Sequence, residues 1–472
     1  NFACLGIQRR DEWLVGVRGY NKYIPANEAY SNANLYGRYM SNGSIMILSK
    51  GDPITNEASG YSHDGWDWSC WPGTTSIHLP VELVKSKFET SESLRSDESY
   101  AGALSCENQN GMFAMKVHES KKYNDSFRAN ISVFMFDNRI ICLGSDIVNT
   151  DAIYPTYTTL FQNHHEENEM IYINSENAIT DMNYINETTT SGVSFLFDNK
   201  QNGYILPKAT NLIVTQGTQN SLAQNDGTDT TGDFSKAVIN HGVNPSGSEY
   251  EYMLLVDTSL EETKNTALRI SEDSNAVYEV IQKDNKAHIV RDIETDITGY
   301  VFFEANTAVN KGRIKSIDTP SMVMISEKGE NEIVVSVCDP DFRFDNSGEE
   351  SDWKEAKSPE HTLELVLLGS YQKEGENDKV QLTENENGTT TLLVTSNNAE
   401  TVEFSLKEKS SQTTIPEETL IAGYLTKISS NKEEEDWVIT LNQVTENVHC
   451  SVKFEGSVVL SEYNSIYRAI AD

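Results

Sequence analysis

The sequence lacks the features that mark several large classes of protein. It has 37 Lys and Arg against 72 Asp and Glu, which gives a formal net charge of -35 over 472 residues. Nucleic acids and anionic lipid surfaces are bound through clustered basic side chains, so this charge argues against both partners. No run of about 18 apolar residues is present, so no membrane-spanning helix is predicted. We therefore expect neither a nucleic-acid partner nor a membrane partner.

Motifs for metal, redox and phosphate chemistry are also missing. The six cysteines are dispersed at positions 4, 70, 106, 142, 338 and 450, without a CxxC pair. This spacing does not predict a zinc or redox site, and we expect buried free thiols. No Gly-rich phosphate loop, HExxH, GxSxG or EF-hand pattern occurs. The sequence therefore assigns no metal site.

Helical periodicity is nearly absent, whereas strand patterns recur along the whole chain. The best helix candidate is 258–270. Paired apolar runs around short polar turns predict hairpins at 131–144 (across Asp137-Asn138), 278–290 and 322–337. Further strands are expected at 250–256, 299–303, 363–368, 380–382, 389–394, 402–406 and within 420–459. Polar composition predicts loops at 219–233 and 345–359. The pattern indicates an all-β protein of stacked antiparallel sheets.

Tryptophan is concentrated near the start of the chain. Four of the six tryptophans (13, 66, 68 and 71) lie within the first 71 residues, and Arg9 and Arg10 precede them. Aromatic faces stack on sugar rings, and Arg side chains pair with carboxylate or sulfate groups. The same tryptophans could instead fill a sandwich core. The residues alone support a carbohydrate site without deciding between these two interpretations.

A family resemblance is carried by several short motifs in the same order. They are Gly-Tyr-Asn-Lys-Tyr at 19–23, Tyr-Gly-Arg-Tyr at 36–39, Gly-Trp-Asp-Trp at 65–68 and Pro-Gly-Thr-Thr-Ser-Ile-His-Leu-Pro at 72–80. Further matches follow within 132–162, 250–253 and 298–300. Together they resemble polysaccharide lyase family 8, the chondroitin, hyaluronate and xanthan lyases, and within it the chondroitin sulfate ABC lyases. The resemblance spans about 8–340 and fades beyond about 345.

The resemblance implies an architecture. Family members have an N-terminal helical toroid, a large antiparallel β supersandwich that is galactose-mutarotase-like, and a smaller C-terminal β-sandwich. We expect the supersandwich and the end of the catalytic region at 1–315 and the C-terminal sandwich at 316–472. An accessory extension after about 410 fits within the second range. The toroid would precede residue 1, so we interpret the chain as a fragment that lacks it.

The resemblance also implies a reaction and its residues. The family cleaves uronic-acid-containing glycosaminoglycans by β-elimination, using a His and a Tyr of the toroid for proton transfer and a supporting Arg and Glu. No residue here matches the His or Tyr motif. Arg10 precedes an acidic-Trp segment as the family Arg does, and Glu107 lies in the family's Ser-x-Glu-x-Gln-x-Gly-Met context. Arg10 and Glu107 are thus the expected catalytic residues, with Arg9, Trp66, Trp68 and Trp71 as expected substrate-binding residues.

Several points stay open at this level. Ser69 and Cys70 stand where the ABC branch tends to have Asn-Arg, so chondroitin or dermatan sulfate and hyaluronan all remain candidate substrates. Some relatives use a divalent cation, calcium or magnesium, but no ligand set is identifiable here. A secreted or periplasmic location is expected because glycosaminoglycans lie outside cells. The main alternative is a non-catalytic carbohydrate-binding β-sandwich protein, and a third is a structural or adhesive protein.

Overall fold

The computed structural model describes residues 1, 3–49, 59–88, 90–306, 308–329, 331–344 and 357–409, and the backbone of 425–431 and 436–441. It divides into two compact units, Asn1–Lys409 and Ser410–Asp472. In the second unit the described backbone forms a hairpin of β30 (Leu425–Asn431) and β31 (Asp436–Leu441). The remainder of the expected extension after 410, and most of the expected loop 345–359, lie outside the described residues.

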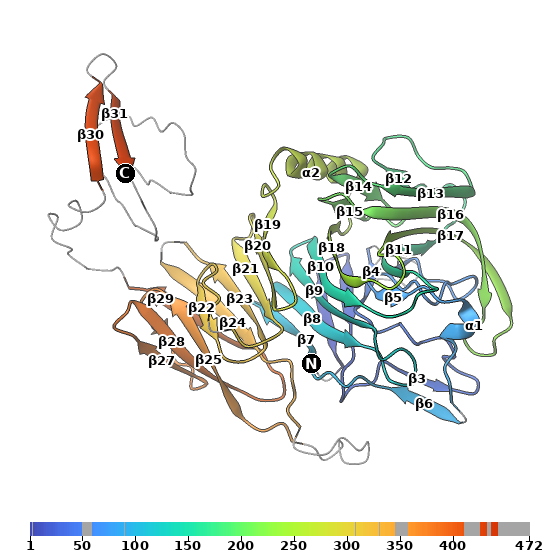
Figure 1. Ribbon diagram of the computed structural model, residues 1–472, viewed down its shortest axis with the longest axis horizontal. Helices are drawn as coiled ribbons and strands as arrows, with labels where there is room; N and C mark the ends of the chain where they lie inside the picture. Colours follow the sequence, from blue (N-terminus) through green and yellow to red (C-terminus); the bar gives the residue numbers. More distant parts are fainter. Residues whose placement is uncertain are drawn as a thin grey trace. The chain divides into compact units, whose positions relative to one another are not determined.

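An eight-stranded antiparallel sheet forms the centre of the first unit (Figure 1), in the order β12-β14-β15-β18-β10-β9-β8-β7. Its strands are β7 (Ala101–Cys106), β8 (Asn110–His118), β9 (Arg128–Phe136), β10 (Arg139–Val148), β12 (Tyr172–Ile173), β14 (Ser194–Phe197), β15 (Gly203–Leu206) and β18 (Ser246–Leu255). Side chains alternate between the two faces of a strand. Ile131 and Val133 therefore enter one hydrophobic core, whereas Phe134 and Phe136 enter another. The apolar run in β9 is continuous because both faces of the sheet are buried.

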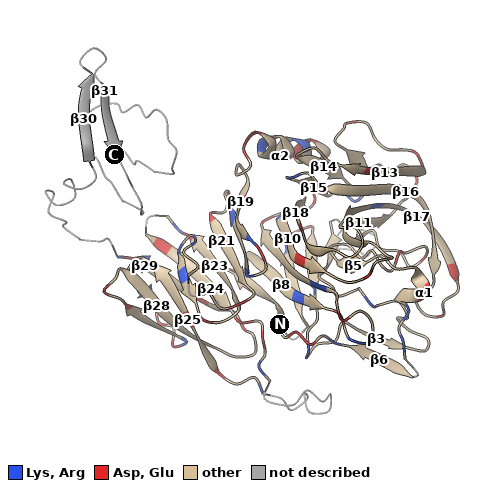
Figure 2. Ribbon diagram, viewed as in Figure 1, with Lys and Arg blue, Asp and Glu red and all other residues tan. Residues whose placement is uncertain are grey.

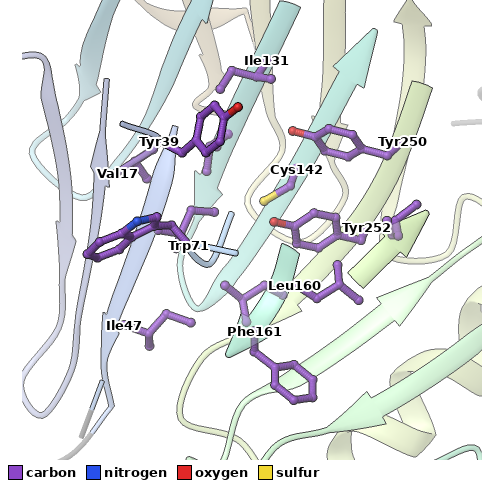
Figure 3. Close-up of a cluster of buried hydrophobic side chains, with 14 of the residues drawn as sticks. Val17, Tyr39, Ile47, Trp71, Ile131, Cys142, Leu160, Phe161, Tyr250 and Tyr252 are labelled. Atoms are coloured by element: carbon purple, nitrogen blue, oxygen red, sulfur yellow. The ribbon is translucent and has the colours of Figure 1, made fainter. Parts of the chain in front are cut away.

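Two smaller sheets cover one face of the central sheet. One has the order β1-β2-β4 and the other β13-β16-β17-β11-β5. Their strands are β1 (Leu5–Arg9), β2 (Leu14–Arg18), β4 (Ser44–Leu48), β5 (Thr75–Ile77), β11 (Thr156–His164), β13 (Asn183–Thr189), β16 (Asn211–Leu222) and β17 (Asp229–Asn240). Figure 3 shows Val17, Ile47 and Trp71 in this core opposite Cys142 and Tyr252 of the central sheet. These layers form the large sandwich.

A seven-stranded sheet covers the other face through the core that contains Phe134 and Phe136. Its own far face packs on a four-stranded sheet, which closes a smaller C-terminal sandwich. The seven strands are β19 (Tyr278–Lys283), β20 (Ala287–Asp292), β21 (Ile297–Phe302), β23 (Ser321–Glu327), β24 (Glu332–Cys338), β26 (Tyr371–Glu374) and β29 (Val402–Glu408). The four are β22 (Ile314–Ile317), β25 (His361–Leu368), β27 (Val380–Glu384) and β28 (Thr389–Ser396). The predicted all-β supersandwich followed by a smaller sandwich is confirmed.

The remaining elements are small. Two short strands, β3 (Asn27–Tyr30) and β6 (Ser91–Leu94), pair with each other. Helix α1 (Val81–Val84) is a single turn, and α2 (Leu260–Glu272) begins at Ser259, whose side chain accepts a 3.0 Å hydrogen bond from the Glu262 amide. This N-cap explains why the predicted helix forms where it does. None of the described helices is long and apolar enough to cross a membrane.

The expected local structure is confirmed at the hairpins and wrong at one loop. β9 and β10 pair across Asp137, which takes the positive φ of 52° that a tight hairpin turn requires. The segment 219–233, expected to be a loop, is instead the outer half of the β16–β17 hairpin, with Leu222 opposite Asp229. That half of the hairpin is almost entirely polar on both faces, so no sustained apolar alternation marked it as strand. The pairing of β19–β21 with β23 also places 278–302 in the C-terminal sheet, whereas the expected boundary was at 315.

Candidate active site

A cavity of about 310 Å³ lies where the end of β1, the β7–β8 hairpin and the C-terminal sandwich meet. We call it the Arg10 pocket. Its lining includes Gln8, Arg9, Arg10, Ser105, Asn108, Gln109, Asn110, Gly111, Ala399, Glu400 and Thr401. Two of the residues predicted from the sequence, Arg9 and Arg10, and most of the hairpin turn that carries Glu107 therefore surround one space.

Arg10 follows directly after β1 and is held from several sides. Its Nε donates to Asp137 Oδ1 at 3.1 Å, and its Nη1 donates to the Arg9 carbonyl oxygen at 3.0 Å. The guanidinium carbon lies 5.8 Å from the centre of the Trp13 ring, a cation–π distance. The side chain is still 31% exposed. Arg10 is thus oriented by the fold but keeps part of its donor surface open, and the Arg9 residue beside it is exposed.

Asp137 links Arg10 to the β7–β8 hairpin. Its backbone amide donates to Asn110 Oδ1 at 2.9 Å, and its carbonyl oxygen accepts from Gln8 Nε2 at 3.0 Å. The β9–β10 turn therefore contacts both walls of the Arg10 pocket. Because one carboxylate pairs with Arg10 while its own backbone is bonded on each side, Asp137 fixes where the guanidinium lies.

Glu107 sits at the tip of the β7–β8 hairpin, where Glu107 and Asn108 both have positive φ, 53° and 56°. Its amide donates to Glu403 Oε2 at 2.7 Å, and its carboxylate Oε2 lies 2.7 Å from Lys328 Nζ. Glu403 and Lys328 both belong to the C-terminal sandwich. The C-terminal sandwich thus holds the hairpin tip in place through one hydrogen bond and one ion pair.

Arg10 and Glu107 are not partners of each other in the described part of the chain. Arg10 pairs with Asp137, and Glu107 pairs with Lys328. They are connected indirectly, because Asn110 of the Glu107 hairpin accepts from the Asp137 turn. The two residues are thus linked through a chain of contacts and not through a direct bond, and the catalytic roles of both stay predictions.

The fold and the pocket can now be compared with known proteins. Residues 6–267 match the family model for the polysaccharide lyase family 8 super-sandwich domain, and residues 279–343 match the model for its C-terminal β-sandwich domain. The chain belongs to polysaccharide lyase family 8. The resemblance inferred from the motifs is therefore confirmed.

Family 8 relatives are known by sequence and by structure. A chondroitin sulfate ABC exolyase of Bacteroides thetaiotaomicron is 33% identical over 399 residues, which cover 78% of this chain and 37% of that protein. One from Proteus vulgaris is 34% identical over 403 residues, covering 79% and 38%. This chain thus spans well under half the length of these relatives. A Paenibacillus xanthan lyase structure superposes with a TM-score of 0.70 at 19% identity, covering 91% of this chain and 40% of that one, and shows the same fold.

The three tryptophans expected to bind substrate lie inside the large sandwich. Trp66 and Trp68 are each 1% exposed and Trp71 is 8% exposed. Trp66 packs edge-on against Tyr61 with ring centres 4.9 Å apart, and Tyr36 stacks on Trp68 at 5.9 Å. A ring that stacks on a sugar must present an open face, and other side chains cover these rings. The structure gives them a core role, and their substrate-binding role stays a prediction.

Sequence reasoning missed the residues that position Arg10 and Glu107. Asp137 was recognised only as a turn residue, although its Asp-Asn dipeptide at least marked the position. Nothing local marked Glu403, which lies 296 positions from its partner Glu107. Lys328 likewise sat in a turn between two predicted strands. Contacts between distant turns follow from how the two sandwiches pack, so only the folded structure reveals them.

Calcium and magnesium prefer ligand sets made of oxygen atoms. Within the described residues, one group of at least three potential ligands comes together: Asp67, Cys70 and His78. It contains one carboxylate, one thiol and one imidazole, and none of the three lines the Arg10 pocket. No step of the chemistry is therefore assigned to a calcium or magnesium ion. Figure 2 shows Lys and Arg dispersed over separate strands and α2.

Proposed function

We propose that this chain supplies the β domains and part of the substrate cleft of a polysaccharide lyase that cleaves uronic-acid-containing glycosaminoglycans by β-elimination. The observation that carries the proposal is the convergence of Arg9, Arg10 and the Glu107 hairpin on one pocket in a family 8 fold. In an otherwise acidic chain, this pocket brings two arginines to the same edge of the molecule.

The chemistry requires three things at the uronic acid. A base removes the proton at C5, the carboxylate charge is neutralised as the enolate-like intermediate forms, and an acid protonates the oxygen that leaves C4. Arg10 suits the second task, because a guanidinium keeps its charge at any working pH and forks onto carboxylates. Asp137 and Trp13 hold it in place while part of it remains open. Glu107 contributes by fixing the hairpin that forms the facing wall.

We further propose that the proton-transfer residues come from an N-terminal helical toroid outside this chain. The chain covers 37% and 38% of the two exolyases described above, so a large part of those proteins has no counterpart here. No residue of this chain matches the family's His or Tyr motif. The 472-residue chain by itself is then expected to bind polysaccharide weakly and to cleave none.

The proposed substrates are chondroitin sulfate, dermatan sulfate or hyaluronan, and the proposed location is the periplasm or the exterior of a bacterial cell. Two relatives bear the name chondroitin sulfate ABC exolyase, which favours the sulfated polymers. Ser69-Cys70, in place of the Asn-Arg that the resemblance leads us to expect, lacks one basic residue that could bind sulfate. Unsulfated hyaluronan is therefore retained as a candidate substrate.

The experiment follows the ultraviolet absorbance of the unsaturated uronate that β-elimination creates. The longest natural protein containing this sequence is incubated with chondroitin sulfate, dermatan sulfate and hyaluronan, and the 472-residue chain is tested in parallel. Absorbance that rises with the natural protein on at least one polymer supports the proposal. Glycan binding without any rise would instead support a non-catalytic carbohydrate-binding protein.

A further inference from the structure

A second cluster of reactive side chains lies in the segment 66–78, away from the Arg10 pocket. Asp67, Cys70 and His78 each contribute one potential ligand atom, and these atoms all lie within 4.8 Å of one another. A carboxylate oxygen, a thiol sulfur and an imidazole nitrogen thus share a space the size of a metal coordination sphere. The proposed lyase chemistry uses none of them.

A tight reversal of the chain brings the three residues together. The Cys70 amide donates to the Asp67 carbonyl oxygen at 3.0 Å, which closes one turn. Gly73, at a φ of 79°, donates to the Thr159 carbonyl oxygen at 2.8 Å as the chain enters β5. A Cβ at Gly73 would lie 2.5 Å from a side-chain carbon of Ile45, so the turn requires glycine. β5 then pairs with β11 and ends just before His78, which returns beside Asp67.

The side chain of Gln162, which is fully buried, fixes the backbone of the cluster. Its Oε1 accepts from the Asp67 amide at 3.0 Å, and its Nε2 donates to the carbonyl oxygens of Asp67 and Cys70 at 3.2 and 3.0 Å. Asp67 Oδ1 is used by the Ser69 amide at 3.1 Å, which leaves Oδ2 facing the cluster. The His78 ring stacks on Tyr157 with ring centres 4.8 Å apart. The three groups are therefore positioned by the fold before any ligand arrives.

Asp67 Oδ2 already attracts cationic groups. It lies 2.9 Å from His78 Nε2 and 2.7 Å from Lys236 Nζ, a lysine of β17 that is 16% exposed. An ammonium group thus sits where a cation is favoured. Lysine has a long flexible side chain, so it can withdraw when a more strongly bound cation competes for the carboxylate.

We propose that Asp67, Cys70 and His78 form a site for a divalent transition-metal ion of the zinc class, with Lys236 as the competing cation. Thiolate, imidazole and carboxylate are the ligands zinc uses, whereas calcium and magnesium prefer oxygen alone. Binding displaces the proton of the Cys70 thiol and any proton on the coordinating nitrogen of His78. Three protein ligands leave a fourth position for water, and the His78 side chain is 34% exposed.

The site can be tested with cobalt as a spectroscopic stand-in for zinc. Co²⁺ is added to the metal-free protein, and the sulfur-to-cobalt charge-transfer absorbance is followed. Zn²⁺ is then added to displace it. We expect one equivalent of Co²⁺ with a thiolate band and displacement by Zn²⁺. Cys70→Ser should abolish the band, and His78→Gln should weaken binding at least tenfold. Cys338→Ser is the matched control, because it removes another buried free thiol and should leave the titration unchanged.

A third variant tests the competition. Lys236→Met removes the ammonium from Asp67 and should tighten Co²⁺ and Zn²⁺ binding several-fold, a direction that loss of structure would not produce. The proposal is overturned if wild-type protein gives no thiolate band, or if Cys70→Ser keeps it. Unchanged or weaker binding in Lys236→Met would overturn the assigned role of the lysine. Thermal unfolding of each metal-free variant checks that the fold is retained. If Cys70→Ser does not fold, the weaker metal binding expected for His78→Gln tests the site in its place.

Discussion

The carboxylate of Glu107 lies 2.7 Å from the ammonium of Lys328, and this pair joins a hairpin tip of the large sandwich to a turn of the C-terminal sandwich. The Glu107 amide bonds to Glu403 of the same second sandwich. The C-terminal sandwich therefore does more than cover a hydrophobic face. It sets the position of a wall of the Arg10 pocket.

Lys328→Met should reduce activity much more than stability. The two side chains are 40% and 27% exposed, and an ion pair of this kind contributes only about 0.2–1 kcal/mol to folding. Without this pair, the hairpin tip and the wall of the Arg10 pocket that it forms should shift. A displacement of about 1 Å at a catalytic site can lower the rate roughly 100-fold. We expect kcat/KM of the natural protein to fall roughly 10-fold, with urea unfolding nearly unchanged. Lys286→Met, which removes an exposed pair with Glu304, is the control. Equal activity in the two variants would show that the Lys328 pair does not position the site.

Asp292→Asn should destabilise the first unit strongly. Asp292 is fully buried and accepts two 2.9 Å hydrogen bonds from Arg139, which connects β10 of the central sheet to β20 of the C-terminal sandwich. Removing the charge of Asp292 leaves the buried Arg139 guanidinium with the half-exposed Glu294 as its remaining charged partner, at a cost of roughly 3 kcal/mol. Urea denaturation measures the loss. Asp296→Asn, at a pair with Arg291 that is 38% and 47% exposed, should cost less than about 1 kcal/mol. Similar losses in both variants would contradict the buried-pair account.

Trp66→Leu separates a core role from a substrate-binding role. Trp66 is 1% exposed and lies among Tyr61, Trp71 and Phe234. Shrinking a buried aromatic side chain leaves a cavity, so the free energy of unfolding should fall by roughly 2–4 kcal/mol. KM for chondroitin sulfate should stay within about twofold of wild type at a temperature where the variant is folded, because a core side chain makes no contact with substrate. Loss of even one methylene-sized substrate contact would cost roughly 10-fold or more. A large rise in KM without a loss of stability would assign Trp66 to the substrate cleft instead.

Acidification should destabilise the protein through His288. The ring is fully buried between Ser132 Oγ at 2.7 Å and Ser145 Oγ at 2.9 Å, and burial lowers its pKa to about 3. In the unfolded chain the pKa returns to about 6.5, so between these values the unfolded state binds a proton that the folded state does not. The stability associated with His288 is complete above about pH 6.5 and declines as pH falls toward 3.

The measurement compares wild type and His288→Gln by urea unfolding between about pH 7 and pH 4.5. The wild-type free energy of unfolding should fall more steeply, by up to about 1.4 kcal/mol per pH unit more than that of the variant. His241, partly buried with a pKa lowered to about 4, keeps some slope in both proteins. Parallel pH profiles would show that His288 is not held neutral by the fold.

Local sequence patterns predicted much of the fold, because hairpins and capped helices are written in neighbouring residues. The Asp137-Asn138 turn and a helix at 258–270 were both predicted from local patterns, and both form, the helix with Ser259 as its N-cap. The outer β16–β17 hairpin was missed, since its residues are almost all polar and show no apolar alternation. The continuous apolar run of β9 predicted a strand, but it did not predict that the two faces of the strand contact two different hydrophobic cores.

The candidate site was predictable only in part. Motif context singled out Arg10 and Glu107, and the structure brings Arg10 and the Glu107 hairpin to one pocket. The partners that position them, Asp137 and Lys328, come from other turns and depend on sheet packing. The concentration of tryptophans near the start of the chain was ambiguous, because the sequence does not distinguish a buried tryptophan from one that stacks on a sugar. Likewise Cys70 and His78 are separated in sequence, and only the turn through Gly73 makes them neighbours.

The central claim is that Arg10 and Glu107 support β-elimination, and one assay tests it most directly. Double-bond absorbance on chondroitin sulfate is measured for the natural protein containing this chain, beside Arg10→Gln and Glu107→Gln. Loss of a transition-state partner predicts a fall in kcat of roughly 10²–10³-fold for Arg10→Gln and at least 10-fold for Glu107→Gln. Turnover equal to wild type in both variants would contradict the account.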